Sequence, residues 1–235
     1  MQLDRILQKH GFGTRKECRA LCWDGRVAVN GLPHGDPFTD IDCGGLVLTV
    51  DGIDWPYAEF VTLMLHKPLG YECSRKPQHH PSVLYLLPPP LRERGVQPIG
   101  RLDADTSGLL LVTDDGQLNH AISSAKRKVP KVYLASTKHP VDQEQIGRLL
   151  SGVLLNDEPE PIAAAACEKA GANLLRLTLT SGKYHQVKRM VAAAGNRVEA
   201  LHREAVGELS LPASLQPGEW RWLVAVDLEK LGYSR

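Results

Sequence analysis

The spacing of short apolar runs in the second part of the chain limits the folds that it can form. Strands are predicted at residues 109–113, 131–137 and 174–180, and helices at residues 142–150 and 184–195. These elements do not follow the regular strand–helix–strand order of a doubly wound parallel sheet. The pattern therefore predicts an α+β fold around a mixed, largely antiparallel sheet.

A separate small domain is predicted before this region. Apolar residues at helical spacing predict a first helix, which ends at the glycines of GFG. Thr14, with Glu17 three residues later, forms a capping-box pattern and starts a second helix. The stretch RVAVNG alternates like a strand and ends in Asn-Gly, a tight-turn signal. We expect one domain over residues 1–58 and another over residues 59–235.

Positive charge is clustered, although the formal net charge is only +1. Basic residues gather on the second predicted helix, over residues 126–131 and over residues 183–189. On that helix Arg15, Lys16 and Arg19 occupy one arc, which can follow a nucleic-acid backbone. The clustering indicates contact with a polyanion, and a solvated charged surface is the alternative.

The sequence argues against several classes of protein. The first residues lack the long apolar run of a signal peptide, and no stretch approaches the roughly 18 apolar residues of a membrane span. The 5 cysteines are odd in number and lack paired CxxC spacing, so buried side chains are expected rather than metal ligands. We expect a soluble, cytoplasmic, metal-free protein without a membrane partner.

The stretch RLDADTSG at residues 101–108 has three interpretations. Its alternating Asp103, Asp105 and Ser107 match the start of an EF-hand loop, but Asp114 stands where that loop needs a glutamate, and an apolar run replaces the other ligands. This argues against calcium. The two aspartates share one side of an extended chain, so they form either an acid–base pair or solvated and capping groups. Spacing alone leaves both interpretations open.

Longer stretches resemble known families. LDRILQKHGFGTRKECRALCWDGRVAVNG is similar to the S4-type RNA-binding module. GRLDADTSGLLLVTDDG resembles the central motif of RNA pseudouridine synthases, in the branch that acts on ribosomal RNA and carries an S4 module in front. HKPLGY, KVYLAS and LTLTSGKYHQVKRMVAAAGNRVEALHR resemble that branch's other motifs, in the same order. The resemblance implies a small S4-like α/β RNA-binding module followed by a pseudouridine-synthase catalytic domain.

The resemblance also implies roles for single residues. Asp103 is the carboxylate that acts as nucleophile or base, and Lys188 is the cation that keeps it ionised in a water-poor pocket. Tyr133 is a second catalytic residue, which packs against the target base, with removal of the C5 proton as an alternative role. Arg101 fills the gap left by the flipped uridine or holds its phosphate. Asp105 is expected to make a turn-stabilising hydrogen bond. Further RNA contacts are expected from Arg15, Lys16, Arg19, Arg26, Lys67, Lys183, His185, Gln186 and Arg189.

Isomerising a uridine oxidises nothing and releases no group, so no cofactor is expected. Within the family, GYECSRKPQHHPSVLYLL and the whole-length correspondence resemble the branch that acts on small-subunit (16S) ribosomal RNA. The expected partner is 16S rRNA or a small-subunit assembly intermediate, bound by a monomer. The alternatives are action on 23S rRNA and a non-catalytic rRNA-binding or ribosome-assembly protein. A glycoside hydrolase is disfavoured, because aromatic residues make up only 6% of the chain.

Overall fold

The computed structural model describes residues 1–233 and divides into two compact units. The first unit comprises residues 1–61 and 87–97, and the second comprises residues 62–86 and the chain from residue 98 onward. The sequence predicted a division after residue 58, and it did not predict that residues 87–97 return to the first unit. Among the described residues, no helix is long and apolar enough to cross a membrane.

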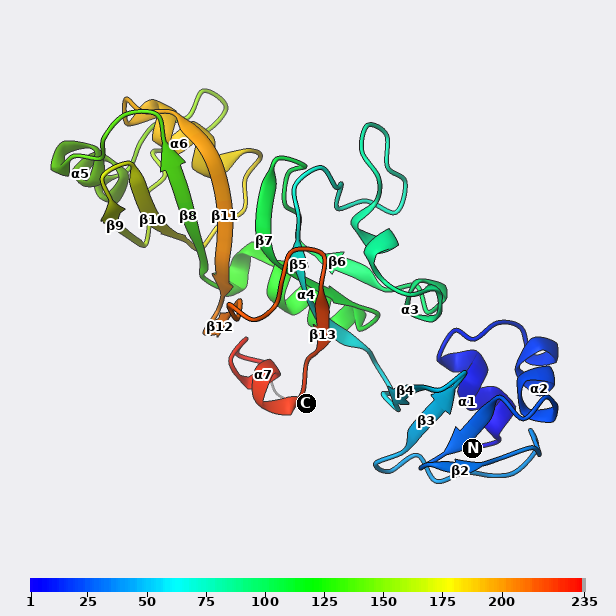
Figure 1. Ribbon diagram of the computed structural model, residues 1–235. Coiled ribbons are helices and arrows are strands. Elements are labelled where there is room, and N and C mark those ends of the chain that lie inside the picture. The colour runs from blue at the N-terminus through cyan, green and yellow to red at the C-terminus, as the bar shows by residue number, and fades with distance from the viewer. Residues whose placement is uncertain (234–235) are drawn as a thin grey trace. The chain divides into compact units, whose positions relative to one another are not determined.

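The first unit contains helices and a four-stranded antiparallel sheet (Figure 1). The capping box predicted at Thr14 is present, because Thr14 and Glu17 exchange hydrogen bonds between side chain and backbone. The Asn-Gly turn also forms, since Asn30 and Gly31 have φ values of 48° and 80°. The elements are α1 (Leu3–Lys9), α2 (Arg15–Trp23), α3 (Pro89–Glu93), β1 (Val27–Val29), β2 (Leu32–Pro33), β3 (Val47–Val50) and β4 (Ile53–Pro56).

Two arginines of α2 are bound to a buried carboxylate. Arg19 Nε lies 2.8 Å and Arg15 Nη2 lies 3.3 Å from Oδ2 of Asp4, whose side chain is fully buried. The guanidinium of Arg19 also covers the ring of Phe38, 4.9 Å from its centroid. The side chain of Lys16 is exposed and forms no hydrogen bond or ion pair with any described residue. Part of the positive arc therefore stabilises the first unit itself.

A nine-stranded mixed sheet forms the second unit. Its main path runs β13-β5-β7-β11-β8-β10-β9, with β12 beside β11 and β6 beside β7. Along this path every pair is antiparallel except β7 with β11, as expected for a mixed, largely antiparallel sheet. The strands are β5 (Thr62–Lys67), β6 (Gln97–Ile99), β7 (Thr106–Thr113), β8 (Lys131–Thr137), β9 (Ala166–Gly171), β10 (Leu174–Leu179), β11 (Val198–Val206), β12 (Leu209–Ser210) and β13 (Trp220–Trp222).

The helices of the second unit cover different parts of this sheet. Helix α4 packs against β7, whereas α5 contacts β9 and α6 contacts β11 (Figure 1). The predicted helix at 184–195 begins only at Gln186, because His185 has a φ of +46°, outside the helical region. The elements are η1 (Val83–Leu86), α4 (Gly116–Ser123), η2 (Ala125–Arg127), α5 (Gln143–Ser151), α6 (Gln186–Ala193) and α7 (Ala225–Glu229).

The parallel pair of β7 and β11 fixes the point at which the chain enters the sheet after RLDAD. The two strands share three register pairs, the last of them Gly108 with Arg203. Glycine is required at position 108, because φ is +112° and a Cβ there would lie 2.3 Å from the backbone oxygen of Arg203. This close approach holds the preceding loop against β11.

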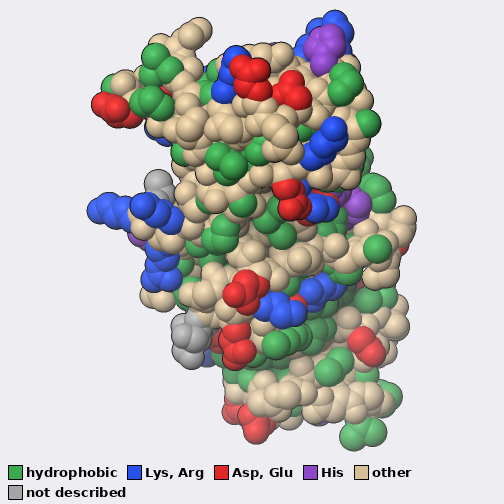
Figure 2. Space-filling view, turned by 90° about the vertical axis from the view of Figure 1, so that its left-hand side faces the viewer, with side chains coloured by type: hydrophobic (Ala, Val, Ile, Leu, Met, Phe, Trp, Pro, Cys, Tyr) green, Lys and Arg blue, Asp and Glu red, His purple; other side chains and the backbone are tan. Residues whose placement is uncertain are grey.

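Charges of both signs are interspersed on the face of the protein shown in Figure 2, in keeping with a net charge of +1. Local clusters nevertheless remain. Lys126, Arg127 and Lys128 are exposed ahead of β8, whereas Lys131, the first residue of that strand, is half-buried. The basic run predicted over residues 126–131 thus divides into an outer group and one inward lysine.

Candidate active site

The loop of residues 100–105 carries Asp103 to the edge of a cleft. The backbone oxygen of Asp103 accepts a hydrogen bond of 3.0 Å from the Thr106 amide, which closes a turn just before β7. The carboxylate is 30% exposed, while Leu102 beside it is buried. Arg101 is exposed, and its side chain bonds to no described residue. Asp103 therefore faces the cleft, with a free guanidinium near its mouth.

The cleft has a volume of about 420 Å³, which suits a group of nucleotide size. Asp103, Arg101, Tyr133 and Lys188, which the sequence analysis singled out, all line it. Tyr133 comes from β8 and is only 9% exposed, so its ring forms part of the wall. Four residues from distant parts of the chain thus meet in one cavity.

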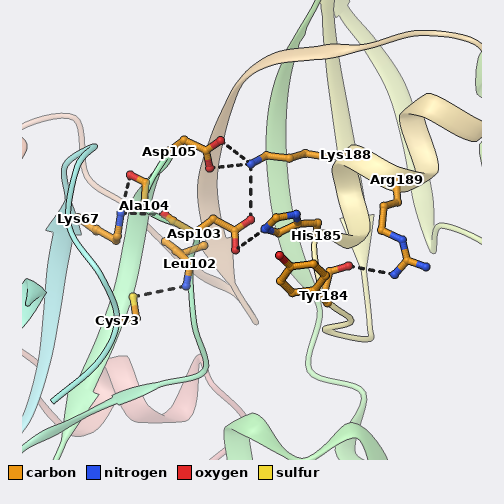
Figure 3. A network of polar contacts seen from close by, with 10 residues as sticks. All are labelled: Lys67, Cys73, Leu102, Asp103, Ala104, Asp105, Tyr184, His185, Lys188 and Arg189. Carbon is orange, nitrogen blue, oxygen red and sulfur yellow. Dashed lines mark hydrogen bonds and ion pairs between the residues drawn. The ribbon is translucent and has the colours of Figure 1, made fainter. Parts of the chain in front are cut away.

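Lys188 forms ion pairs with two carboxylates, those of Asp103 and Asp105 (Figure 3). Its Nζ lies 2.6 Å and 2.7 Å from the carboxylate oxygens of Asp105, and 3.6 Å from Oδ2 of Asp103. The hydrogen bonds from Lys188 lower the pKa of Asp105. Asp105 was expected to stabilise a turn through a hydrogen bond. In the structure its carboxylate instead holds the lysine beside Asp103.

His185 also reaches Asp103. Its Nε2 lies 3.5 Å from Oδ1 of Asp103, and its ring stacks on Tyr184 with 3.8 Å between the ring centroids. Its φ of +46° is unusual for a residue other than glycine, and such strained backbone is often found at functional sites. The sequence analysis expected an RNA contact from His185, and the structure places its ring beside Asp103.

Lys67 does not contact solvent, which corrects its expected role as an RNA contact. The side chain is fully buried at the end of β5. Its Nζ donates to the backbone oxygens of Pro68 (3.0 Å), Asp103 (3.0 Å), Thr106 (2.8 Å) and, more weakly, Ala104 (3.5 Å). Burial lowers the pKa of Lys67. The ammonium group fixes the backbone of the Asp103 loop from inside the protein.

Three residues at the start of α6, for which RNA contacts were expected, bind to other parts of the protein. Gln186 is buried, and its Oε1 accepts hydrogen bonds from the Lys183 amide (2.8 Å) and from Ser181 Oγ (3.1 Å). It therefore shapes the turn before α6, at the wall of the cleft. Lys183 and Arg189 are both engaged in ion pairs, with Glu158 and Asp157 respectively. In the first unit, Arg26 is exposed and paired with Asp51 at 2.6 Å.

Thr106, Lys131 and Arg203 also line the cleft, and the sequence analysis did not single them out as site residues. A signal for Lys131 was present, because it precedes Tyr133 by two positions on a strand and therefore shares its face. Arg203 is the last residue of the motif LTLTSGKYHQVKRMVAAAGNRVEALHR, but β11 mixes charged and apolar residues, so the pattern does not show that its side chain is buried. Among the described residues, no group of His, Cys, Asp and Glu side chains is arranged to hold a metal ion.

The shared lysine leads to a prediction. We expect Lys188→Met to lower the rate of the chemical step by about 100-fold, because it removes a fixed charge beside Asp103. Asp105→Asn should cause a smaller loss, since Lys188 remains and is free to move toward Asp103. Single-turnover rates of both variants test this order. Greater damage from Asp105→Asn would contradict it.

The pH dependence of the ion pair between Asp105 and Lys188 follows from the pKa of Asp105. Because the pKa of Asp105 is lowered, its pair with Lys188 persists above the ordinary aspartate range and is lost only as the pH falls through the lowered value. The Asp105 side chain is 73% exposed, so little change in overall stability is expected.

Comparison with known proteins supplies an independent result. A family model described as RNA pseudouridylate synthase matches residues 61–193. The uncharacterized RNA pseudouridine synthase YtzG of Bacillus subtilis is 39% identical over 98% of both chains. The ribosomal small subunit pseudouridine synthase A of Yersinia pestis is 42% identical, covering 99% of this chain and 98% of its own. A crystal structure of pseudouridylate synthase aligns with a TM-score of 0.70 at 34% identity, over 98% of this chain and 99% of its own.

Proposed function

Since this chain belongs to the RNA pseudouridine synthase family, we propose that it isomerises one uridine of small-subunit (16S) ribosomal RNA to pseudouridine. The 42% identity to a ribosomal small subunit pseudouridine synthase A, over almost the whole of both chains, supports this choice of RNA. We further propose that the protein is a cytoplasmic monomer and that it modifies either free rRNA or rRNA in an assembling subunit.

The observation that carries the chemistry is the position of Asp103 in the cleft, within 3.6 Å of Lys188 and 3.5 Å of His185. The target uridine leaves its stack, at a cost of a few kcal/mol, and enters the cleft. Asp103 then acts as nucleophile or base, with the ammonium group of Lys188 beside it. The C1′–N1 bond breaks, the base turns, and C5 joins the ribose. Tyr133 packs against the base during these steps.

Arg101 is the residue best placed to compensate for the missing base. It lies at the mouth of the cleft with its guanidinium free, two positions before Asp103. A planar guanidinium can stack on neighbouring bases and donate hydrogen bonds at the same time. We propose that it fills the gap in the RNA stack or holds the phosphate of the flipped nucleotide.

The first unit is proposed to act as an S4-like RNA-binding module, and Lys16 offers a clean test. Arg15 and Arg19 also neutralise the buried Asp4, so removing them would destabilise the unit and confuse a binding experiment. Lys16→Gln removes one exposed charge without breaking a contact. We expect weaker RNA binding, a shallower salt dependence by about one counterion and an unchanged melting temperature. Unaltered affinity and salt slope would contradict an RNA-binding role for this helix.

The choice of RNA is tested by release of tritium from C5 of uridine, which accompanies isomerisation. Transcripts of 16S and 23S rRNA, both labelled at C5, are incubated with the wild-type protein at equal concentration. The proposal expects release from 16S rRNA. Release from 23S rRNA alone would keep the chemistry and replace the substrate. If neither naked transcript reacts, the same assay on assembling small subunits decides whether 16S rRNA is the substrate at all.

A further inference from the structure

Two cations inside the cleft have no role in the steps described above. We propose that Lys131 and Arg203 stabilise the negative charge that develops on the uracil ring when it separates from the ribose. They would then be catalytic residues, together with the hydroxyl of Thr106, which lines the same cleft. This inference rests on the proposed binding of the target base in the cleft.

Arg203 is a buried charge without a counter-ion. Its side chain is 2% exposed, and no carboxylate among the described residues forms an ion pair with it. Its one hydrogen bond within the described chain runs from Nε to the backbone oxygen of Leu109, at 2.8 Å. Burying an uncompensated charge is strongly unfavourable. Because Arg203 lies at the wall of the cleft, its guanidinium is available to donate hydrogen bonds to a negatively charged ligand.

Lys131 places a second cation in the same part of the cleft. It is half-buried on β8, and its Nζ donates to the backbone oxygen of Val129 at 3.1 Å, without an acidic partner among the described residues. Burial and then the nearby charge of Arg203 lower the pKa of Lys131. The two like charges therefore repel each other in the cleft. An anion between them would remove this repulsion.

Thr106 adds an unpaired donor to this wall. Its side chain is 1% exposed, and its Oγ1 is buried without a hydrogen-bond partner in the described chain. Buried polar groups are nearly always paired, so an unpaired hydroxyl in a cleft points to a bond made with the ligand. The backbone oxygen of Thr106 is already bonded to Lys67, which fixes the residue in place.

The reaction supplies the anion that these groups need. When the C1′–N1 bond breaks, its electron pair stays on N1 and is delocalised over the O2 and O4 oxygens of uracil. After the ring turns, a ring electron pair forms the bond from C5 to C1′, the proton on C5 passes to water, and N1 takes a proton from water. The charge therefore exists only between detachment and rejoining. Cations that meet it at that stage lower the barrier without strengthening the binding of uridine.

The alternative anion is the phosphate of the target nucleotide, and kinetics separates the two. A phosphate carries its charge throughout, so its contacts contribute to RNA affinity. The uracil charge is transient, so its contacts contribute to the rate of the chemical step. Lys131→Met is the main variant, because Lys131 is only half-buried. Lys138→Met is the matched control, since Lys138 is exposed just past the same strand.

We expect Lys131→Met to reduce the single-turnover rate by about 100-fold with unchanged RNA affinity, and Lys138→Met to match the wild type. Arg203→Lys, which retains the charge, should keep more activity than Arg203→Met. A loss of affinity with an unchanged rate would assign the cations to phosphate and overturn the inference. A wild-type rate for Lys131→Met would overturn it as well.

An equilibrium measurement tests the charge directly. RNA carrying 6-azauridine at the target position presents a base that ionises near neutral pH, with its charge spread over the same two oxygens. Relative to uridine RNA, the wild type should bind this RNA more tightly as the pH rises from 6 to 8, and Lys131→Met should lose that gain. Equal gains in both proteins would contradict the inference. A wild type that forms no pseudouridine on any rRNA would instead refute the proposed function.

Discussion

Replacing Asp103 with asparagine should abolish pseudouridine formation, with a loss of at least about 1,000-fold in the single-turnover rate. Asparagine keeps the size of the side chain but removes the negative charge that faces Lys188 and His185. RNA affinity should be retained, because Arg101 and the first unit are unchanged. Product formation and RNA binding are measured on the same preparation, so that misfolding is distinguished from lost chemistry.

Asp105→Asn is the matched control for this variant. It makes the same chemical change two residues away, on a carboxylate that binds Lys188 more closely than Asp103 does. A smaller loss from Asp105→Asn identifies Asp103 as the reacting group and Asp105 as a positioning residue. Equal losses would show that the pair acts as a unit, and activity in Asp103→Asn would refute the assignment.

Lys67→Met should reduce both stability and activity. It removes the ammonium that binds the backbone oxygens of Asp103 and Thr106, and it leaves these buried acceptors without their donor. We expect a loss of about 3–5 kcal/mol in the free energy of unfolding of the second unit, because each buried acceptor left unpaired costs about 1–3 kcal/mol. The melting temperature of that unit should fall by about 6 °C or more.

The activity of Lys67→Met is measured well below its melting temperature. Even the folded fraction should react about 100-fold more slowly, because a displaced Asp103 loop misaligns the carboxylate. Lys76→Met is the control, since Lys76 is a lysine of the same unit whose side chain bonds to no described residue. Wild-type stability and activity in Lys67→Met would show that these hydrogen bonds contribute little.

The sequence correctly predicted the elements that a few neighbouring residues specify. The capping box at Thr14 and the turn at Asn30 and Gly31 appear as expected, because each is specified by neighbouring residues. Strand β9 was missed, since it is exposed along most of its length and lacks an apolar face. The return of residues 87–97 to the first unit depends on distant packing, which no local pattern encodes.

The resemblance predicted which residues line the cleft, but it did not predict which polar residues are buried. Asp103, Tyr133 and Lys188 meet in the cleft, as the resemblance implied. Lys67 and Gln186 lie inside two of the family-like motifs, and RNA contacts were expected of both. The structure buries them, and burial depends on strand pairing and turn geometry that the sequence pattern did not reveal.

The most direct test of this account is nucleotide-resolution mapping of pseudouridine in 16S rRNA after incubation with the wild type and with Asp103→Asn. The account predicts one modified uridine with the wild type and none with the variant. A modified uridine with both proteins would contradict the role of Asp103. No modification of 16S rRNA by the wild type, either naked or in assembling subunits, would contradict the proposed substrate.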